Sequence, residues 1–367
     1  MYKILIVPKS QYGYNTDYFK MANYLAKQNV LVDILCIDQG FKRIDPPHNV
    51  NVVYVERKSK GKNIINYIKN IINYIFNRRK EYNWIIVSGT IQFCGHIPIL
   101  LKKFTPKTLW IMDIRTGAVV EDEWKRNLYD SSMTWSSKFF DHITIISDLL
   151  AIKLKLDRYF LLPLGAEQII DVSSKEVNKD QMNFIYIGTF DNRNIDNVIK
   201  AFDIFCSKFD NQIKNRFDIV GFSSNEETQQ TILETIENAR NKDKIIFHGR
   251  KNHDEIITLF KEATVGFSYI PITDYYNVQP PTKTFEYIMN GVICIGTNTE
   301  ANAQIINEKN GLLTNDDIDS VVEGIETVFN KLSSYNSLEV SRTVEDYSWI
   351  KIEQRFYKFL RNVDLNK

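Results

Sequence analysis

Short apolar runs alternate with helical patterns over residues 2–167. The runs are apolar at nearly every position, which is typical of strands that are buried on both faces of a sheet. Helical patterns between such runs predict a parallel, doubly wound α/β sheet with helices on both faces. Ligands of such sheets bind beyond the carboxyl ends of the strands. The predicted strands are 3–7, 31–37, 52–55, 84–88, 108–112, 142–147 and 159–162.

A polar stretch without periodicity, residues 171–182, follows this series and predicts an interdomain linker. Alternating strands and helices then return over residues 183–345, which predicts a second Rossmann-like domain. Its predicted strands are 184–188, 217–221, 245–249, 265–270 and 292–297.

The last segment, residues 346–367, has the pattern of an amphipathic helix. Its apolar positions at near-helical spacing are Trp349, Ile352, Phe356 and Leu360. Because two complete sheets precede it, we expect this helix to pack back on the first domain, residues 1–170. Two domains would then face each other across a cleft.

The length of 367 residues, with 44% hydrophobic and 13% aromatic residues, provides material for two cores. Residues 1–7 enter a strand without the architecture of a signal peptide, and no apolar run approaches the ~20 residues of a membrane span. We therefore expect a cytoplasmic protein. The scattered cysteines, without a C-x-x-C pair, indicate a reducing compartment and disfavour zinc: Cys36, Cys94, Cys206 and Cys294.

The net charge of +1 conceals an asymmetry between the two halves. Residues 1–170 hold 24 Lys and Arg against 15 Asp and Glu, whereas residues 171–367 hold 22 against 30. Much of the excess surrounds an apolar helical pattern within residues 57–80, at Arg57, Lys58, Lys60, Lys62, Lys69, Arg78, Arg79 and Lys80. This segment is either a core helix with a solvated basic face or a helix that docks on an anionic membrane. Nucleic acid is disfavoured as a partner, because no groove-reading motif is evident.

Residues 280–291, Pro-Pro-Thr-Lys-Thr-Phe-Glu-Tyr-Ile-Met-Asn-Gly, predict a helix that starts at the proline pair. Pro281 suits the first turn, where its missing N–H costs nothing, and the free amides behind it can hold an anion. Lys283 adds a positive charge, and Glu286, about one turn on, can accept hydrogen bonds from ribose hydroxyls. The pattern indicates a nucleoside-diphosphate pocket, with a capped surface helix as the alternative.

Six motifs follow one another in the second domain. They are Phe-Ile-Tyr-Ile-Gly-Thr-Phe-Asp-Asn-Arg from Phe184, Phe-Asp-Ile-Val-Gly from Phe217, Ile-Ile-Phe-His-Gly-Arg from Ile245, Val-Gly-Phe-Ser-Tyr-Ile-Pro from Val265, the 280–292 stretch and Asn-Gly-Leu-Leu from Asn310. In order and spacing the series resembles the C-terminal half of GT-B retaining glycosyltransferases of family 4. The first half resembles that family only in strand order, in Gly13, and around Ser147 and residues 163–165.

The resemblance implies roles for residues of the second domain. Glu286 matches the second glutamate of the family's E-x7-E motif and would take the donor's ribose hydroxyls. Lys283 and the amides near Thr282 would face the diphosphate. Arg193, together with Lys283 or Arg250, would neutralise the leaving diphosphate, and Gly188 of the first motif belongs to the same donor site.

One position departs from the family pattern. Val278, not glutamate, stands eight residues before Glu286. The sugar contacts of the missing glutamate must then come from neighbours, for which we predict Asn277 and Gln279, with Tyr276 or backbone amides as alternatives.

In the first domain, Asp113 and Arg115 are candidates for binding the sugar or the acceptor hydroxyl, and an internal ion pair is the alternative. Gly13 is expected to let the loop after the first strand approach the donor closely, unless it is only a turn glycine. The family works without a DXD-type metal site, and no acidic pair in this sequence is convincingly placed for Mg²⁺. We therefore expect no cofactor and no metal, with the nucleotide sugar as substrate.

These observations predict a cytoplasmic, peripherally membrane-bound retaining glycosyltransferase. It would move a sugar from a nucleotide-diphosphate donor to a glycan or lipid-linked acceptor in cell-surface polysaccharide assembly. The alternatives are a non-catalytic nucleotide-sugar-binding subunit, which Val278 favours, and a GT-B epimerase. A dehydrogenase is excluded, because no G-x-G-x-x-G motif follows the first strand of either domain.

Overall fold

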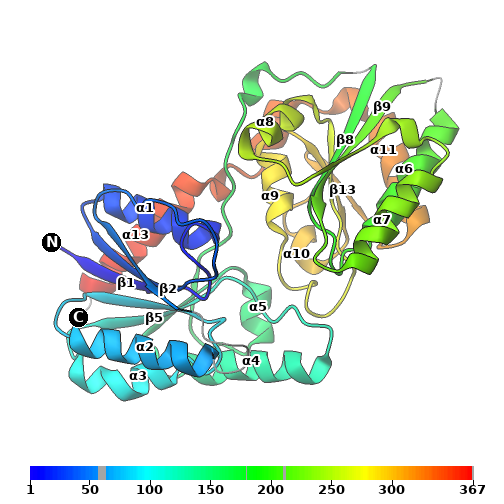
Figure 1. Cartoon of the computed structure of the whole chain (residues 1–367). Helices are drawn as coiled ribbons and strands as arrows, with labels where there is room; N and C mark the ends of the chain where they lie inside the picture. The colour runs from blue at the N-terminus through cyan, green and yellow to red at the C-terminus, as the bar shows by residue number, and fades with distance from the viewer. Residues whose placement is uncertain (57–62, 179, 210–211, 366–367) are drawn as a thin grey trace. The chain divides into compact units, whose positions relative to one another are not determined.

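The computed structural model describes residues 1–56, 63–178, 180–209 and 212–365. The chain forms two compact units, of which unit 1 comprises Met1–Leu164 and Trp349–Lys367, and unit 2 comprises Gly165–Ser348. Figure 1 shows one α/β sheet in each. No helix within the described ranges is long and apolar enough to span a bilayer.

Unit 1 is built on a seven-stranded sheet in the order β3-β2-β1-β4-β5-β6-β7, and every pair in it is parallel. The strand order reverses between β1 and β4, which makes their carboxyl ends the expected ligand edge. The strands are β1 (Lys3–Val7), β2 (Leu31–Ile37), β3 (Val50–Val55), β4 (Trp84–Ser88), β5 (Leu109–Ile114), β6 (His142–Ile145) and β7 (Phe160–Leu161).

The helices of unit 1 cover both faces of its sheet. Figure 1 shows α1 and α13 together on one face and α2 with α3 on the other. They are α1 (Thr16–Lys27), α2 (Asn63–Asn77), α3 (His96–Leu101), α4 (Glu123–Ser137), α5 (Asp148–Lys153) and α13 (Trp349–Leu365), with a short 3₁₀ turn η1 (Lys102–Phe104) after α3. The apolar positions predicted for the last helix are buried in the core of unit 1: Trp349, Ile352, Phe356 and Leu360.

Unit 2 repeats the design with six parallel strands in the order β10-β9-β8-β11-β12-β13. Here the order reverses between β8 and β11. The strands are β8 (Gln181–Thr189), β9 (Lys214–Phe222), β10 (Ile245–Gly249), β11 (Val265–Ser268), β12 (Ile293–Thr297) and β13 (Gly311–Thr314). The helices are α6 (Ile195–Phe209), α7 (Glu226–Asn238), α8 (His253–Glu262), α9 (Thr282–Met289), α10 (Glu300–Ala303), α11 (Ile318–Asn330) and α12 (Ser337–Arg342).

The predicted domain boundaries need correction. The units divide at 164/165 and at 348/349 rather than at 170 and 345, so residues 171–182, the predicted linker, belong to unit 2. Val172 is buried, and the Lys175 ammonium donates hydrogen bonds to the carbonyl oxygens of Phe260 at 2.8 Å and Asn290 at 3.3 Å. These contacts hold a segment that is polar in sequence to the ends of two helices.

Lys175 couples the stability of unit 2 to pH. Burial lowers the pKa of its ammonium from 10.5 to about 7. Between these values the unfolded chain binds more protons than the folded chain, so this group makes the folded state more stable as the pH rises. The interval begins near pH 7 and ends near the ordinary lysine pKa.

We expect Lys175 to raise the free energy of unfolding of unit 2 by about 2 kcal/mol between pH 7 and pH 9. Hydrogen exchange of the β8 amides, corrected for intrinsic rates, measures the change. Lys175→Met should lack this rise, whereas Lys309→Met, at an exposed lysine of the same unit, should keep it. An equal pH response in Lys175→Met and the wild type would contradict the assignment.

Candidate functional site

A cavity of about 220 Å³ opens in unit 2 at the carboxyl ends of β8 and β11. This is the point where the strand order of the sheet reverses, and open α/β sheets bind ligands there. Three segments supply the walls: the end of β8 with the following loop, the end of β11, and the start of α9. The lining residues are Tyr186, Ile187, Gly188, Thr189, Arg193, Phe267, Ser268, Tyr269, Ile270, Pro281, Thr282 and Lys283.

Four of the predicted donor residues therefore line one cavity. They are Gly188, Arg193, Thr282 and Lys283. Sequence reasoning had not selected Tyr186, Thr189 or Ser268, although the first two belong to the same strand motif as Gly188. The sequence did contain a signal for these residues, because they lie at the carboxyl ends of predicted strands, and every strand of a parallel sheet contributes its carboxyl end to the ligand-binding edge.

The end of β8 is kept open by a glycine. The buried Tyr186 phenol donates to the carbonyl oxygen of Thr189 at 2.7 Å, and burial raises the pKa of this phenol. A Cβ atom on Gly188 would lie 2.9 Å from the phenol oxygen. A larger residue would displace Tyr186, so glycine preserves the shape of this cavity wall.

The loop after β8 is fixed by a carboxylate. Asp191 accepts hydrogen bonds from the hydroxyls of Ser223 and Ser224, and the bond from Ser223 is the main cause of its lowered pKa. Asn192 and Asn194 have φ of 55° and 50°, in the left-handed region that asparagine tolerates better than most residues. This rigid turn presents Arg193 between them.

Arg193 has a guanidinium N–H group that could donate a hydrogen bond to a ligand. Its guanidinium lies 4.4 Å from the ring centroid of Tyr276, a distance at which cation and π face attract. Its Nη1 atom is buried and has no hydrogen-bond partner among the described residues. A buried charged donor without a partner is costly, and an anionic ligand in the cavity would supply that partner.

Helix α9 begins without a side-chain cap. Pro281 is its N-cap, with ψ of 140°, rather than a residue of the first turn as predicted. The first backbone amides therefore keep their capacity to bind an anion, and the helix dipole adds positive potential. Lys283 forms an ion pair with Glu286 one turn along, so both predicted charges stand at this helix start.

Buried polar side chains fix α9 to the sheet. The hydroxyls of Ser268 and Thr284 lie 2.7 Å apart, and Thr284 donates to Asn302 Oδ1 at 2.8 Å. Asn302 in turn donates to the carbonyl oxygen of Thr297 at 3.0 Å, which links β11, α9 and β12. The position of Thr282 and Lys283 at the cavity depends on this chain of bonds.

Four predicted donor residues of unit 2 are not among those that line the cavity: Arg250, Asn277, Gln279 and Glu286. Asn277 donates to the Glu300 carboxylate at 2.6 Å and accepts from the Glu300 amide at 2.8 Å. Gln279 is buried and donates to the carbonyl oxygen of Tyr275 at 2.6 Å. Arg250 follows β10, which is two strands away from β8 in the sheet, and its guanidinium lies 3.5 Å from the ring centroid of Phe222. The direct sugar contacts predicted for Asn277 and Gln279 stay predictions.

Asp113 and Arg115 form a buried polar network within unit 1. Arg115 donates to Asp17 at 2.8 Å and to the carbonyl oxygens of Leu162 and Pro163 at 2.7 and 3.0 Å. Asp113 belongs to β5 itself and is 1% exposed, and burial raises its pKa against the opposing effect of Arg115. This is the geometry of the internal ion pair that the sequence left as the alternative.

The loop after β1 needs its glycine for two reasons. Gly13 has φ of 89°, and a Cβ atom there would lie 2.3 Å from the Ile44 side chain. Close to this strand end, a second cavity of about 220 Å³ opens in unit 1. Its lining includes Lys9 after β1, Gln92 after β4 and Thr116 after β5. Both units thus carry a cavity at the carboxyl edge of their sheet.

The sequence of unit 2 resembles a known protein family. Residues 168–339 match the family model described as Glycosyl transferases group 1. Unit 2 is therefore similar to glycosyltransferase group 1 domains. The match lies within residues 165–348 and confirms the predicted enzyme class, a glycosyltransferase. No curated protein sequence matches the chain.

Solved structures share the fold at low sequence identity. Sucrose-phosphate synthase from Thermosynechococcus elongatus has a TM-score of 0.79 at 15% identity, with 100% of each chain covered. A glycosyltransferase from Rickettsia africae reaches 0.74 at 14% identity, over 100% of this chain and 99% of that one. Anabaena HepE, solved with UDP-glucose, reaches 0.72 at 11% identity, over 98% of this chain and 99% of that one. The likeness confirms the predicted GT-B class of two Rossmann-like domains.

We expect Thr284→Val to lower the free energy of unfolding of unit 2 by about 1–3 kcal/mol. The change keeps the shape of the side chain but leaves Ser268 and Asn302 without a shared buried partner. Urea unfolding followed by hydrogen exchange of β11 and β12 measures the loss.

The matched control is Thr231→Val on α7, where the exposed hydroxyl only donates to the carbonyl oxygen of Glu227. We expect this change to stay within about 0.5 kcal/mol of the wild type. Equal stability of the Thr284 and Thr231 variants would show that the buried bonds do not fix α9.

Proposed function

We propose that the protein is a retaining glycosyltransferase that moves a sugar from a nucleoside-diphosphate donor to a glycan or lipid-linked acceptor. The observation that carries this proposal is the cavity of unit 2, which combines the unpartnered Arg193 Nη1, Lys283 and the uncapped start of α9. All three favour a diphosphate. Structures of the same fold contain UDP, UDP-glucose or UDP-2-fluoro glucose, which supports a nucleotide sugar as donor.

The proposed chemistry places charge stabilisation at the leaving group. When the anomeric C–O bond breaks, negative charge grows on the β-phosphate, and catalysis requires groups that stabilise this charge. Arg193, Lys283 and the α9 amides would supply them from the chain itself, so we propose transfer without a metal or cofactor. Retention of configuration rests on the family resemblance.

The Lys283–Glu286 ion pair would be exchanged when the donor binds. Lys283 would turn to the diphosphate, and Glu286 would accept hydrogen bonds from the ribose hydroxyls. In the free protein each charge holds the other at the start of α9. This exchange makes Glu286 a specific probe of donor binding.

We expect one of UDP, GDP, ADP, CMP and NAD to stabilise the wild type in a thermal-shift panel. A ligand at a hundredfold excess over its Kd contributes about 2.7 kcal/mol, which is readily visible. Glu286→Ala should shrink the shift by removing the ribose contact. The matched control is Glu339→Ala. Glu339 also forms an i,i+3 ion pair, with Arg342 on α12, and both of these side chains are exposed.

Absence of any shift, or equal shifts in Glu286→Ala and the wild type, would overturn the donor site. A nucleotide that binds without donor hydrolysis or transfer to any acceptor would instead favour the non-catalytic subunit. That alternative keeps its support from Val278, where the family has glutamate. The epimerase alternative predicts conversion of the donor sugar in the absence of an acceptor.

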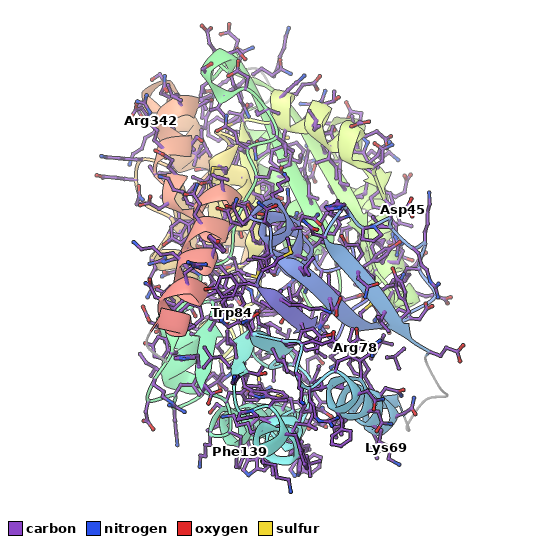
Figure 2. All side chains as sticks on the ribbon, turned by 90° about the vertical axis from the view of Figure 1, so that its left-hand side faces the viewer. Asp45, Lys69, Arg78, Trp84, Phe139 and Arg342 are labelled. Atoms are coloured by element: carbon purple, nitrogen blue, oxygen red, sulfur yellow. The ribbon has the colours of Figure 1, made fainter. Side chains whose placement is uncertain are left out.

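We further propose that unit 1 docks on an anionic membrane, on the cytoplasmic side, where lipid-linked acceptors of cell-surface polysaccharides are found. Exposed apolar residues lie along α2, α3 and η1, and the rings of Phe76 and Phe104 join these elements at 5.3 Å. Arg79 and Lys103 lie over these two rings, and Figure 2 marks Lys69 on α2. The exposed apolar residues are Ile65, Phe76, Ile99, Leu100 and Phe104.

This combination of apolar area and positive charge suits a surface of anionic lipid. The predicted basic residues Arg57, Lys58, Lys60 and Lys62 lie outside the described residues. The proposal therefore rests on α2, α3 and η1 alone.

We expect the double variant Leu100→Asp, Lys103→Glu to bind vesicles that contain phosphatidylserine at least tenfold more weakly than the wild type. The control pair Ile152→Asp, Lys138→Glu makes the same changes at other exposed positions of unit 1. Sedimentation with the vesicles measures binding. Unchanged binding of the Leu100 variant, or an equal loss in both variants, would remove the assignment of this surface.

A further inference from the structure

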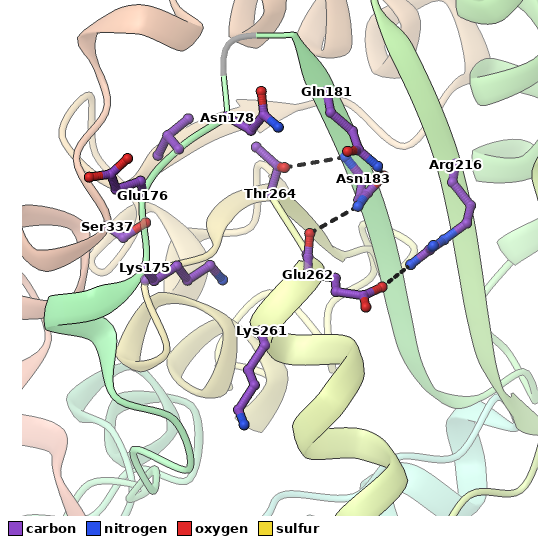
Figure 3. A pocket seen from close by; sticks show the side chains of 13 residues that line it. Lys175, Glu176, Asn178, Gln181, Asn183, Arg216, Lys261, Glu262, Thr264 and Ser337 are labelled. Carbon is purple, nitrogen blue, oxygen red and sulfur yellow. Dashed lines mark hydrogen bonds and ion pairs between the residues drawn. The ribbon is translucent and has the colours of Figure 1, made fainter.

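A second, larger cavity of about 400 Å³ lies in unit 2, at the amino ends of the strands. Its volume falls in the range of small-molecule pockets. Figure 3 shows Lys175 and Ser337 entering from one side and Asn183 and Thr264 from the other. The lining residues are Lys175, Glu176, Val177, Asn178, Gln181, Asn183, Arg216, Lys261, Glu262, Ala263, Thr264, Gly291 and Ser337.

This cavity is separate from the proposed donor site. The two share no lining residue. Along β8, Asn183 lines the second cavity and Gly188 lines the first, and five strand residues span roughly 17 Å. The two cavities therefore stand at opposite edges of one sheet, so binding at one can be tested without the other.

The Lys175 ammonium is the cationic group at the centre of this cavity. It donates to the carbonyl oxygens of Phe260 and Asn290, near the ends of α8 and α9. An ammonium has three donors, so one N–H remains for a ligand. Burial lowers the pKa of Lys175 to about 7, and an anion beside it would restore its charge.

Ser337 provides the second independent sign of a ligand. Its side chain is 1% exposed, and its hydroxyl has no hydrogen-bond partner among the described residues. Buried hydroxyls are normally hydrogen-bonded, so a buried one without a partner that lines a cavity needs an explanation. A ligand that offers a donor or acceptor here would satisfy it.

The remaining lining is polar and slightly positive. Arg216 is neutralised by Glu262 at 2.6 Å and by Asp218 at 2.9 Å. The other charged residues of the lining are Lys175 and Lys261, which are basic, and Glu176, which is acidic. The Glu176 side chain points away from the centre of the cavity in Figure 3. The rest of the wall combines amide and hydroxyl groups, among them Asn178, Gln181 and Thr264, with the apolar Val177 and Ala263. Such a wall suits an anion that also carries hydroxyl groups.

We propose that this cavity binds a small phosphate ester of a polyol, with the phosphate at Lys175 and the hydroxyl groups at Ser337 and the Asn183–Thr264 side. The ester occupies a ligand site of unit 2 apart from the donor cavity. This assignment does not rest on the proposed glycosyl transfer, because it uses none of the donor residues.

Isothermal titration with glycerol 3-phosphate, ribose 5-phosphate and inorganic phosphate tests the site on the full chain. We expect an ester to bind at least tenfold more tightly than inorganic phosphate, and glycerol to give no binding. Lys175→Met should weaken ester binding at least tenfold, and Ser337→Ala at least threefold. Lys309→Met, at an exposed lysine, and Glu286→Ala, in the donor site, should bind as the wild type does.

A second measurement uses only the wild type. The bound ester should slow acetylation of Lys175 at least threefold, as read by mass spectrometry, and leave Lys309 unchanged. The proposal would be overturned if the wild type did not bind the ester, or if Lys175→Met and Ser337→Ala both bound it as tightly as the wild type does. Acetylation of Lys175 at the same rate with and without the ester would also overturn it. Loss of ester binding in Glu286→Ala would also overturn it, because the ester would then occupy the donor cavity. Should Lys175→Met fail to fold, Ser337→Ala and the acetylation measurement decide.

Discussion

The chemistry of unit 2 depends on the buried hydroxyl and amide groups that hold α9 to the sheet. Ser268, Thr284 and Asn302 connect α9 to the ends of β11 and β12, and the Ile187 amide donates to the Tyr287 hydroxyl at 2.8 Å. Because these groups are buried, any displacement of α9 would leave several of them without partners. The helix is therefore held in one register, and the start that carries Thr282 and Lys283 is fixed beside Gly188.

The dipole of α9 favours a negative group at the start of the helix and a positive group at its end. The N-terminal amides face the cavity for which we propose a diphosphate, and the C-terminal carbonyl of Asn290 accepts a hydrogen bond from the Lys175 ammonium. One helix thus borders two cavities at opposite edges of the sheet. Asn290 strengthens the arrangement, because its side chain also bonds the backbone of Glu167 and Ile169.

Local pattern was sufficient to predict the strand ends and the helix start that form the donor cavity. Lys283 and the amides near Thr282 were predicted from the helix that starts at the proline pair, whereas Gly188 and Arg193 were predicted from the family resemblance. The parallel sheet brings the ends of β8 and β11 and the start of α9 to one edge. The partners of other candidates come from distant parts of the chain. Glu300, which bonds Asn277, lies 23 residues after it, and Phe222, which contacts Arg250, lies on the neighbouring strand. These contacts depend on tertiary packing, which no local sequence pattern encodes.

The same reason explains the misplaced linker and the internal network around Arg115. Residues 171–182 are polar, which normally indicates a connection between domains, but the carbonyls that receive Lys175 stand 85 and 115 residues away. Arg115 meets Asp17, 98 residues away, in the core of unit 1. A charged residue at a strand end can serve a ligand or the fold, and only the tertiary partners distinguish the two.

The departure at Val278 bears on which part of a donor unit 2 can recognise. The groups that favour a diphosphate, Arg193, Lys283 and the α9 amides, are in place, whereas the carboxylate that the family sets eight residues before Glu286 is absent. Asn277 beside it is already bonded to Glu300 in both directions. The chain thus supplies more groups for the phosphates than for the sugar, so we expect the nucleotide to contribute most of the binding free energy of the donor. Selectivity for the sugar would depend on how the Asn277–Glu300 pair responds to a bound donor.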